Sequence, residues 1–295
     1  KRASMPRLRR AFAAAAAALL TLITVPTGSV ALAQPGQSRT IGASTADANS
    51  PVNRAGVYLE VTTPQNQRIA CSGTLITEIH VLTAKHCVYN TMYKQNLFQE
   101  ATAFIGLDRT NAEEIAVTKV TRSPSADLAI LTLTEAADTT PAQVWGGTVN
   151  LDAPFVASGF GTGNNTTPLK RMGESYVNIT NTGDYTLREV DATTQTGYFG
   201  QPLGNSRITQ GDSGGALHND GYVVAVNSAV YEDEGDFWMI FTPTQQHAAW
   251  IQSIAPGSVA GLVLEPSMSS LFATGSFFSP VDEQQHGVTG ERVTA

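Results

Sequence analysis

Short strand-forming segments follow one another at close spacing through most of this chain of 295 residues. Turn-forming pairs such as Ser123-Pro124 and Thr140-Pro141 separate them. Only Gln245–Ile254 has apolar residues at helical spacing. Many short strands with one terminal helix predict an all-β barrel or sandwich. The expected strands are Val57–Thr62, Arg68–Ile76, Ile79–Thr83, Ala101–Ile105, Ile115–Val120, Leu128–Leu133, Phe155–Gly159, Tyr176–Ile179, Thr186–Val190, Gly221–Val230 and Phe237–Phe241.

The remaining polar segments are interpreted as connections. Gln195–Gly204 and Asn164–Thr167 are expected to be loops, because turn-forming residues are frequent in both. Residues 34–55 have no apolar period and are expected to form an irregular lead-in. From about residue 263 onward the composition is polar and rich in Gly, Ser and Pro, so we expect a flexible tail over 263–295.

The first 33 residues are typical of a secretory signal peptide. Five basic residues precede an apolar run from Ala11 to Val25, and the small-residue pattern Ala31-Leu32-Ala33 follows. The alternative is a transmembrane anchor. The apolar run is shorter than the roughly 20 residues that span a bilayer. Cleavage after Ala33 and secretion to the extracellular medium are therefore expected.

Composition limits the classes of partner. Charged residues make up only 15% of the chain and apolar residues 42%, which is typical of a globular domain. The net charge is −7, and removal of the first 33 residues, with five basic and no acidic side chains, lowers it to −12. An acidic protein is a poor partner for nucleic acids or anionic membranes. We expect neither for the mature chain.

The chain has two cysteines, Cys71 and Cys87. In an exported protein such a pair favours a disulfide, and two free buried thiols are the alternative. No cluster of Cys and His has the spacing of a zinc site, so no metal is expected.

The stretch Gln210–Leu217 places one serine and one aspartate among glycines, in the order Gly211-Asp212-Ser213-Gly214-Gly215. Glycines allow a sharp turn that exposes the Ser213 hydroxyl and lets backbone N–H groups converge on one point. Acyl transfer needs a nucleophile beside such donors. Without further motifs, the stretch would be interpreted as a glycine-rich hairpin loop.

Two further motifs lie upstream of this serine. They are Leu82-Thr83-Ala84-Lys85-His86-Cys87 and Asp127-Leu128-Ala129-Ile130-Leu131. With Gly211–Gly215, the order His, Asp, Ser resembles the chymotrypsin-like (trypsin-like) serine peptidases. Lys85 stands where that family has alanine, and Ala216 stands where it has proline. The resemblance covers roughly residues 40–255, including a Ser158-Gly159-Phe160-Gly161-Thr162 run that is similar to the family's Ser-Gly-Trp-Gly-Thr strand.

The resemblance implies two six-stranded antiparallel β-barrels packed face to face, with a short C-terminal helix. Together with the signal peptide at 1–33, the expected organisation is a short pro-segment at 34–39 and a peptidase domain at 40–262, in which the resemblance implies a barrel boundary near residue 140. The resemblance pairs Cys71 with Cys87. His86 and Asp127 would come from the first barrel and Ser213 from the second.

The residue roles are likewise implied by the resemblance. Ser213 is the nucleophile, His86 the general base and acid, and Asp127 the residue that orients the imidazole. The backbone N–H groups of Gly211 and Ser213 form the oxyanion hole. No cofactor is required. The implied partners are protein or peptide substrates and protein inhibitors of proteases, and we expect a monomer.

Specificity and activation rest on less direct matches. The residues matching the primary pocket are Arg207, Gln210, Ser228 and Val230. Arg207 at the pocket base would favour an acidic residue before the scissile bond, whereas Val230 would narrow the entrance and favour a small one.

Activation in the family frees a new N-terminus that pairs with the aspartate before the catalytic serine. Here that residue is Asp212, and the cleavage would follow Arg39 in Arg39-Thr40-Ile41. The alternative is that Arg39 is an ordinary linker residue.

Other interpretations compete with a peptidase. A secreted protease-like binding domain would usually lack a triad residue, and an esterase or lipase would usually show the order Ser, Asp, His in an α/β pattern. Asp108 competes with Asp127 as the acid, but Asp127 opens an apolar strand and is preferred. The remaining histidines and the tryptophans are interpreted as surface or packing residues: His80, His218, His247, Trp145, Trp238 and Trp250.

Overall fold

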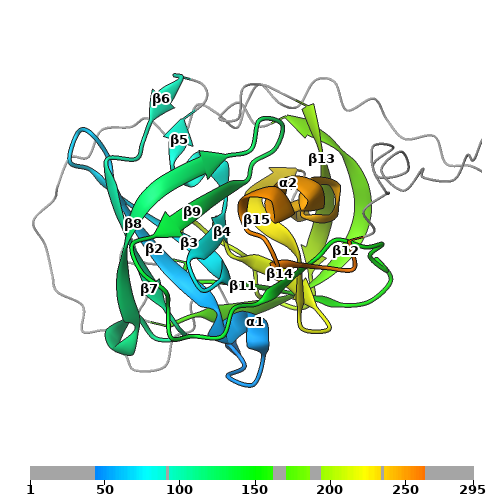
Figure 1. Ribbon diagram of the computed structural model, residues 1–295. Helices are drawn as coiled ribbons and strands as arrows, with labels where there is room; N and C mark the ends of the chain where they lie inside the picture. The colour runs from blue at the N-terminus through cyan, green and yellow to red at the C-terminus, as the bar shows by residue number, and fades with distance from the viewer. Residues whose placement is uncertain (1–43, 91–92, 162–170, 187–193, 234–235, 263–295) are drawn as a thin grey trace, which may run out of the picture. The chain divides into compact units, whose positions relative to one another are not determined.

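The computed structural model describes residues 44–90, 93–161, 171–186, 194–233 and 236–262, which all belong to the unit Ser38–Ala295. Its first half is a closed antiparallel barrel of six strands (Figure 1). In barrel order these are β2 (Gly56–Thr62), β3 (Arg68–Thr77), β4 (His80–Thr83), β9 (Ala129–Leu133), β8 (Glu113–Arg122) and β7 (Glu100–Ile105). A hairpin of β5 (Tyr89–Asn90) and β6 (Gln95–Asn96) leaves the barrel between β4 and β7.

The second half closes in the same way, because β14 pairs with both β11 and β15. In order the strands are β14 (Ala216–Asn219), β11 (Phe155–Gly159), β12 (Gly173–Thr186), β13 (Thr194–Pro202), β16 (Asp236–Pro243) and β15 (Tyr222–Asp233). The short strand β10 (Gln143–Trp145) runs parallel to β15 on one side and to β17 (Val259–Ala260) on the other. The predicted pair of six-stranded barrels is therefore confirmed.

Alternating burial explains why these segments form strands. In β7 the side chains of Ala101, Ala103 and Ile105 are buried, and those between them are more exposed. Period-two alternation directs one face of each strand into the barrel. The C-terminal segment forms a 3-10 turn at Gln245–His247 and the helix α2 (Ala248–Ile254), whose Ile251 joins the larger apolar core.

Two local expectations were wrong, and one strand is longer than expected. Tyr176–Ile179 lies in a strand as expected, but that strand, β12, extends from Gly173 to Thr186. Gln195–Gly204 is not a loop, because it provides most of β13, which pairs with β12 along the hairpin. The lead-in also contains β1 (Ser44–Thr45) and the short helix α1 (Pro51–Arg54), which Ser50 caps through its side chain.

Strand β13 was not predicted because its residues do not show the sequence pattern that is typical of a strand. Its residues Gln195 and Gly197 are buried although neither is a typical strand former. Several other expectations lie outside the described residues: the signal peptide at 1–33, the pro-segment at 34–39, the loop Asn164–Thr167, the end of the expected strand Thr186–Val190 and the tail at 263–295.

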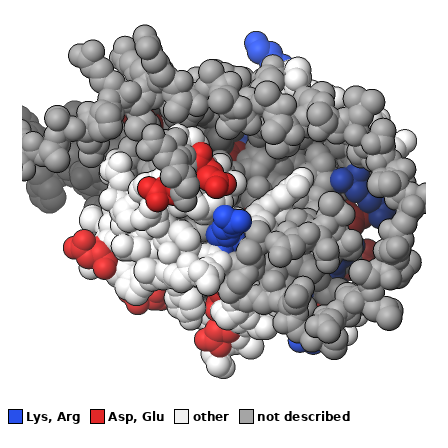
Figure 2. Space-filling model, turned by 180° about the vertical axis from the view of Figure 1, so that it is seen from behind, with Lys and Arg blue, Asp and Glu red and all other residues white. Residues whose placement is uncertain are grey.

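The surface charge is mixed. On the face shown in Figure 2, acidic and basic side chains of the described residues are scattered among neutral ones and form no continuous basic surface. No helix in the described part of the chain has the length and apolar character needed to cross a membrane.

Candidate active site

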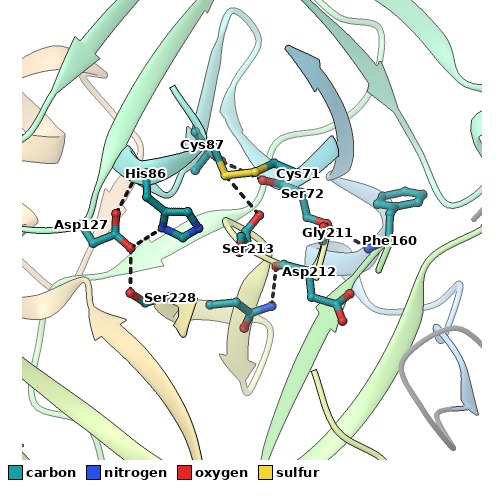
Figure 3. Close-up of a disulfide and its surroundings, with 12 residues drawn as sticks. Cys71, Ser72, His86, Cys87, Asp127, Phe160, Gly211, Asp212, Ser213 and Ser228 are labelled. Atoms are coloured by element: carbon teal, nitrogen blue, oxygen red, sulfur yellow. Dashed lines mark hydrogen bonds and ion pairs between the residues drawn. A yellow bond between two sulfur atoms is a disulfide. The ribbon is translucent and has the colours of Figure 1, made fainter. Parts of the chain in front are cut away.

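His86 lies in a 3-10 turn (Lys85–Cys87) that follows strand β4 directly. Asp127 accepts two hydrogen bonds from His86. The Oδ1 atom of Asp127 accepts from the His86 backbone N–H at 2.9 Å, and its Oδ2 atom accepts from the His86 ring Nδ1 at 2.8 Å. Figure 3 shows the imidazole between the carboxylate of Asp127 and Ser213. Two fixed hydrogen bonds determine both the position and the rotation of the ring.

A turn that the Ser123 side chain stabilises, just before β9, places Asp127 next to His86. The Ser123 hydroxyl accepts hydrogen bonds from the backbone N–H groups of Ser125 and Ala126, and the Ser123 N–H binds the Leu128 carbonyl. Such serine-centred turns reverse the chain within a few residues. Asp127 thereby enters the protein interior with no exposed surface.

The buried Asp127 remains an anion. Burial raises the pKa of a carboxyl group, but the positive charge and hydrogen bonds of His86 and the hydroxyl of Ser228 hold the pKa of Asp127 below its ordinary value. Ser228 donates to Oδ2 at 2.7 Å, the same oxygen that faces the imidazole. A carboxylate fixed in this way stabilises an adjacent imidazolium.

Ser213 lies on a turn that only glycines can form. Gly211 and Gly214 have φ angles of 91° and 85°, in the left-handed region. A Cβ at Gly214 would also collide with the Thr83 hydroxyl and the Ser72 carbonyl. The turn therefore packs against the first barrel through glycine backbone.

Two polar residues hold this turn. From the first barrel, Ser72 donates its backbone N–H to the Ser213 carbonyl at 2.7 Å and its hydroxyl to the Gly211 carbonyl at 2.8 Å. From β15, the Asn227 amide donates to the Asp212 carbonyl at 3.0 Å, and its backbone carbonyl accepts from Gly214 at 2.8 Å. Both barrels thus fix the position of Ser213.

The disulfide Cys71–Cys87 is confirmed. It joins strand β3 to the turn that carries His86, and the Cys87 sulfur lies 3.7 Å from the Ser213 carbonyl oxygen (Figure 3). The bond connects two segments 16 residues apart and therefore restrains the histidine relative to the serine turn.

Backbone donors are available beside Ser213. The N–H groups of Asp212, Gly214 and Gly215 bind the carbonyls of Thr209, Asn227 and Asp212, respectively. Within the described ranges, no acceptor binds the N–H of Gly211 or Ser213. These two groups are free to bind an oxygen atom of a ligand.

Asp212 points away from Ser213 into an enclosed position next to β11. Its carboxylate accepts hydrogen bonds from the N–H groups of Gly161 and Thr209, both at 2.7 Å, and from the Thr209 hydroxyl at 3.3 Å. A Cβ at Gly159 or Gly161 would collide with this carboxylate. Burial raises the pKa of Asp212 to about 7.

The residues expected to form the specificity pocket are spread around β15. Ser228 is buried and bound to Asp127, whereas Val230 is 48% exposed and Gln210 is also exposed. The guanidinium carbon of Arg207 lies 4.7 Å from the centroid of the Phe237 ring. A cation on an aromatic face is stabilised without a carboxylate partner.

The competing residues lie elsewhere. Asp108 accepts a hydrogen bond from Arg171 at 2.7 Å, and His80 contacts the Thr77 hydroxyl at 2.8 Å. His218 is buried, which lowers its pKa to about 4. Trp145 packs at an angle of 54° against Tyr222.

Sequence reasoning missed several residues near Asp127. Tyr185 donates a hydrogen bond to Ser228 and is hydrogen-bonded to Thr242, and Gln195 accepts a hydrogen bond from the Asp127 N–H. The residues come from strands far apart in the chain, and Gln195 had been placed in a loop. Only a correct prediction that β12 pairs with β13 would have placed these residues near Asp127.

Comparison with known proteins gives concordant results. A family model described as Trypsin matches residues 41–251. A protein of Corynebacterium glutamicum strain R that is described as an uncharacterized peptidase is 26% identical over 209 residues, which cover 67% of this chain and 68% of the relative. A protein of C. glutamicum strain ATCC 13032 that is described as a putative peptidase has the same identity and coverage.

The fold is similar to that of two solved proteases. The mouse serine protease neuropsin has a TM-score of 0.54 and 18% identity, over 70% of this chain and 96% of that protein. The Rv3671c protease of M. tuberculosis in its active form has a TM-score of 0.55 and 19% identity, over 79% and 97% of the two chains. With a family match over more than half its length, this chain belongs to the trypsin family of serine proteases.

Proposed function

We propose that this protein is a secreted serine endopeptidase that hydrolyses peptide bonds through His86, Asp127 and Ser213. The observation that carries the proposal is the buried Asp127 carboxylate, which binds the His86 ring nitrogen at 2.8 Å on the side facing away from Ser213. That arrangement is the one needed to draw a proton from a serine hydroxyl.

The proposed reaction proceeds through an acyl-enzyme. The Ser213 hydroxyl attacks the carbonyl carbon of the peptide bond while His86 accepts its proton, and the imidazolium then protonates the departing amine. Water attacks the resulting ester by the reverse sequence of proton transfers. The free N–H groups of Gly211 and Ser213 would bind the oxyanion in both steps.

Asp127 stays ionised throughout this cycle. Its pKa is lowered by the positive charge of His86 and by hydrogen bonds that stabilise the anion, so it accepts no proton and instead fixes the tautomer in which His86 Nδ1 carries the hydrogen. The other ring nitrogen is then the basic one. The triad uses no metal or organic cofactor, and its substrates are proteins or peptides.

Activation by proteolysis fits the surroundings of Asp212. The described chain begins at Ser44, which pairs with Glu174 of β12, and Glu174 pairs in turn with Ser158 of β11. Two strand spacings are about 10 Å. A chain of four residues spans up to ~13 Å, so a new terminus at Thr40 is long enough to bring its amine to the Asp212 carboxylate.

The activation proposal is tested by sequencing the N-terminus of secreted, active protein. A start at or next to Thr40, and a loss of activation in Arg39→Gln, are expected. An active form that still begins at Gln34 would contradict it.

For specificity we propose that Arg207 selects an acidic residue before the scissile bond. The guanidinium can exchange its contact with the Phe237 ring for two parallel hydrogen bonds to a substrate carboxylate. Kinetics on matched peptides ending in Glu, Ala, Leu and Arg give the ranking. The same ranking in Arg207→Ala would show that this side chain takes no part in selection, and a preference for Ala would instead favour restriction by Val230.

The peptidase activity itself is tested by incubating the protein with a peptide library and identifying products by mass spectrometry. Wild-type protein is expected to generate new termini after a limited set of residues, and Ser213→Ala none. Equal product formation by the two proteins would exclude Ser213 as the nucleophile. A folded wild type that produces no termini would favour a binding domain.

A further inference from the structure

A row of side-chain hydroxyls connects the interior of the second barrel to Asp127. Ser228 of β15 lies 2.7 Å from Asp127 Oδ2, and Tyr185 of β12 lies 3.3 Å from the Ser228 oxygen. The Tyr185 oxygen in turn lies 2.9 Å from the hydroxyl of Thr242 on β16. Three strands thus contribute one residue each to a continuous row.

The carboxylate sets the direction of every hydrogen bond in the row. An ionised carboxylate only accepts, so the single hydroxyl proton of Ser228 points to Asp127. The Ser228 oxygen then accepts from Tyr185, which uses the single proton of the tyrosine. Thr242 must therefore donate to Tyr185, and hydrogen bonds that run in one direction polarise and strengthen one another.

Packing holds the Tyr185 ring in this position. A Cβ at Gly197 would collide with the ring, so glycine on the neighbouring strand leaves space for it. Phe199 contacts the ring edge-to-face, with centroids 6.2 Å apart. Burial together with the nearby charge of Asp127 raises the pKa of Tyr185, so the phenol keeps its proton.

The strand next to Tyr185 contacts Asp127 a second time. Gln195 is the cross-strand partner of Tyr185, and its Oε1 accepts the Asp127 N–H at 2.9 Å. The cross-strand pair Tyr185 and Gln195 therefore contacts Asp127 twice: Gln195 binds its backbone, and Tyr185 reaches its carboxylate through Ser228. Both contacts cross from the second barrel to the first.

We propose that Tyr185 is a positioning residue for the proposed catalysis: it holds the Ser228 hydroxyl toward Asp127 and so fixes the carboxylate that orients His86. The inference rests on the proposed peptidase function. Tyr185 acts through Ser228 and touches neither substrate nor the reacting atoms.

The test compares Tyr185→Phe with wild type in the processed full chain, using a peptide identified by cleavage profiling. Loss of one hydrogen bond is expected to lower kcat roughly threefold to tenfold with KM within about twofold. Tyr198→Phe is the matched control, because within the described ranges no hydrogen bond joins its hydroxyl to Ser228 or Asp127. Unchanged kcat in Tyr185→Phe would overturn the proposal.

A double-mutant cycle separates positioning from packing. If Tyr185 acts through Ser228, Tyr185→Phe should reduce kcat no further once Ser228→Ala is present. An equal additional loss in the Ser228→Ala background would mean that the Tyr185 hydroxyl acts independently of Ser228, which would overturn the proposal.

A spectroscopic measurement keeps this inference separate from the peptidase proposal. The proton between His86 Nδ1 and Asp127 gives a downfield NMR resonance, and Tyr185→Phe should move it further downfield, since a Ser228 hydroxyl that Tyr185 no longer polarises competes less for Oδ2. The same position in wild type and Tyr185→Phe would overturn the inference even if the enzyme is active. A shifted resonance in a protein whose Ser213→Ala variant still cleaves would show that the hydroxyl row orients Asp127 but would refute the peptidase mechanism, and with it the catalytic role of Tyr185.

Discussion

The two barrels differ in what fills them. Among the described residues, the larger apolar cluster is built mainly from the first barrel, with buried side chains such as Leu75, Leu82 and Leu131. The second barrel has a smaller apolar cluster and buries more hydrogen-bonding side chains, including Tyr185, Asn227 and Thr242. Apolar packing supplies stability without direction, whereas buried hydrogen bonds fix orientation and are costly when incomplete.

The comparison assigns different tasks to the two halves. The first barrel supplies His86 and Asp127 on short segments that a rigid core and the disulfide restrain. The second barrel supplies Ser213 and the polar contacts that orient both Ser213 and Asp127. Apart from the triad residues themselves, substitutions in the first barrel should therefore mainly reduce stability, and polar substitutions in the second should mainly reduce activity.

The largest effect is expected where the two barrels meet, at Asp127. Asp127→Asn replaces an acceptor for His86 Nδ1 by a group that also donates, which favours the wrong imidazole tautomer. We expect kcat to fall by about 10⁴. Steady-state kinetics check this, with circular dichroism as the folding control, and a loss of less than tenfold would contradict the assigned role.

Core truncation in the first barrel should affect stability. Leu131 is fully buried, and Leu131→Ala should lower the free energy of unfolding by about 2 to 5 kcal/mol. The polar counterpart, Thr242→Val in the second barrel, should lower kcat roughly threefold with a smaller change in stability. Urea unfolding and steady-state kinetics on both variants test these expectations. A larger loss of stability in Thr242→Val, with a larger loss of kcat in Leu131→Ala, would contradict the assigned roles of the two barrels.

The disulfide should contribute to stability in the first barrel. Cys71→Ser with Cys87→Ser should lower the free energy of unfolding by about 3 kcal/mol, mainly because the unfolded chain is no longer constrained. Thermal unfolding of the double variant beside wild type measures this. Equal melting temperatures would show that the surrounding packing suffices.

The stability of the protein before activation cleavage should depend on pH through Asp212 of the second barrel. Burial raises the pKa of Asp212 to about 7 from an ordinary value of 3.8, so between these values the folded chain keeps a proton that the unfolded chain has released. Stability of the unprocessed protein should therefore decrease as the pH rises through this window. Asp212→Asn should remove that component, and identical pH profiles of the melting temperature would contradict it.

The all-β class was predictable because most strands alternate, and the two-barrel fold was implied by the resemblance that the motifs around His86, Asp127 and Ser213 carry. The first barrel follows its pattern closely: expected strands such as Val57–Thr62 differ from the observed ones by a residue or two. In the second barrel, β13 contains buried Gln195 and Gly197, which give no strand pattern. Its identity depends on cross-strand pairing, which a single sequence does not encode locally.

The same limit applies to the site. The serine motif predicted a glycine turn, and Gly211 and Gly214 adopt left-handed φ angles. The hydroxyl row through Tyr185 was not predictable, because its members are brought together only when three distant strands pair. Local chemistry identifies candidate reacting groups, whereas tertiary pairing determines which residues orient them.

The central claim is that Ser213 is a nucleophile activated by His86. The most direct measurement is the intact and peptide-level mass of processed protein after reaction with a fluorophosphonate. We expect a single adduct on Ser213 in wild type, greatly slowed labelling in His86→Ala, and none in Ser213→Ala. An adduct on another residue, or equally fast labelling without His86, would contradict the claim.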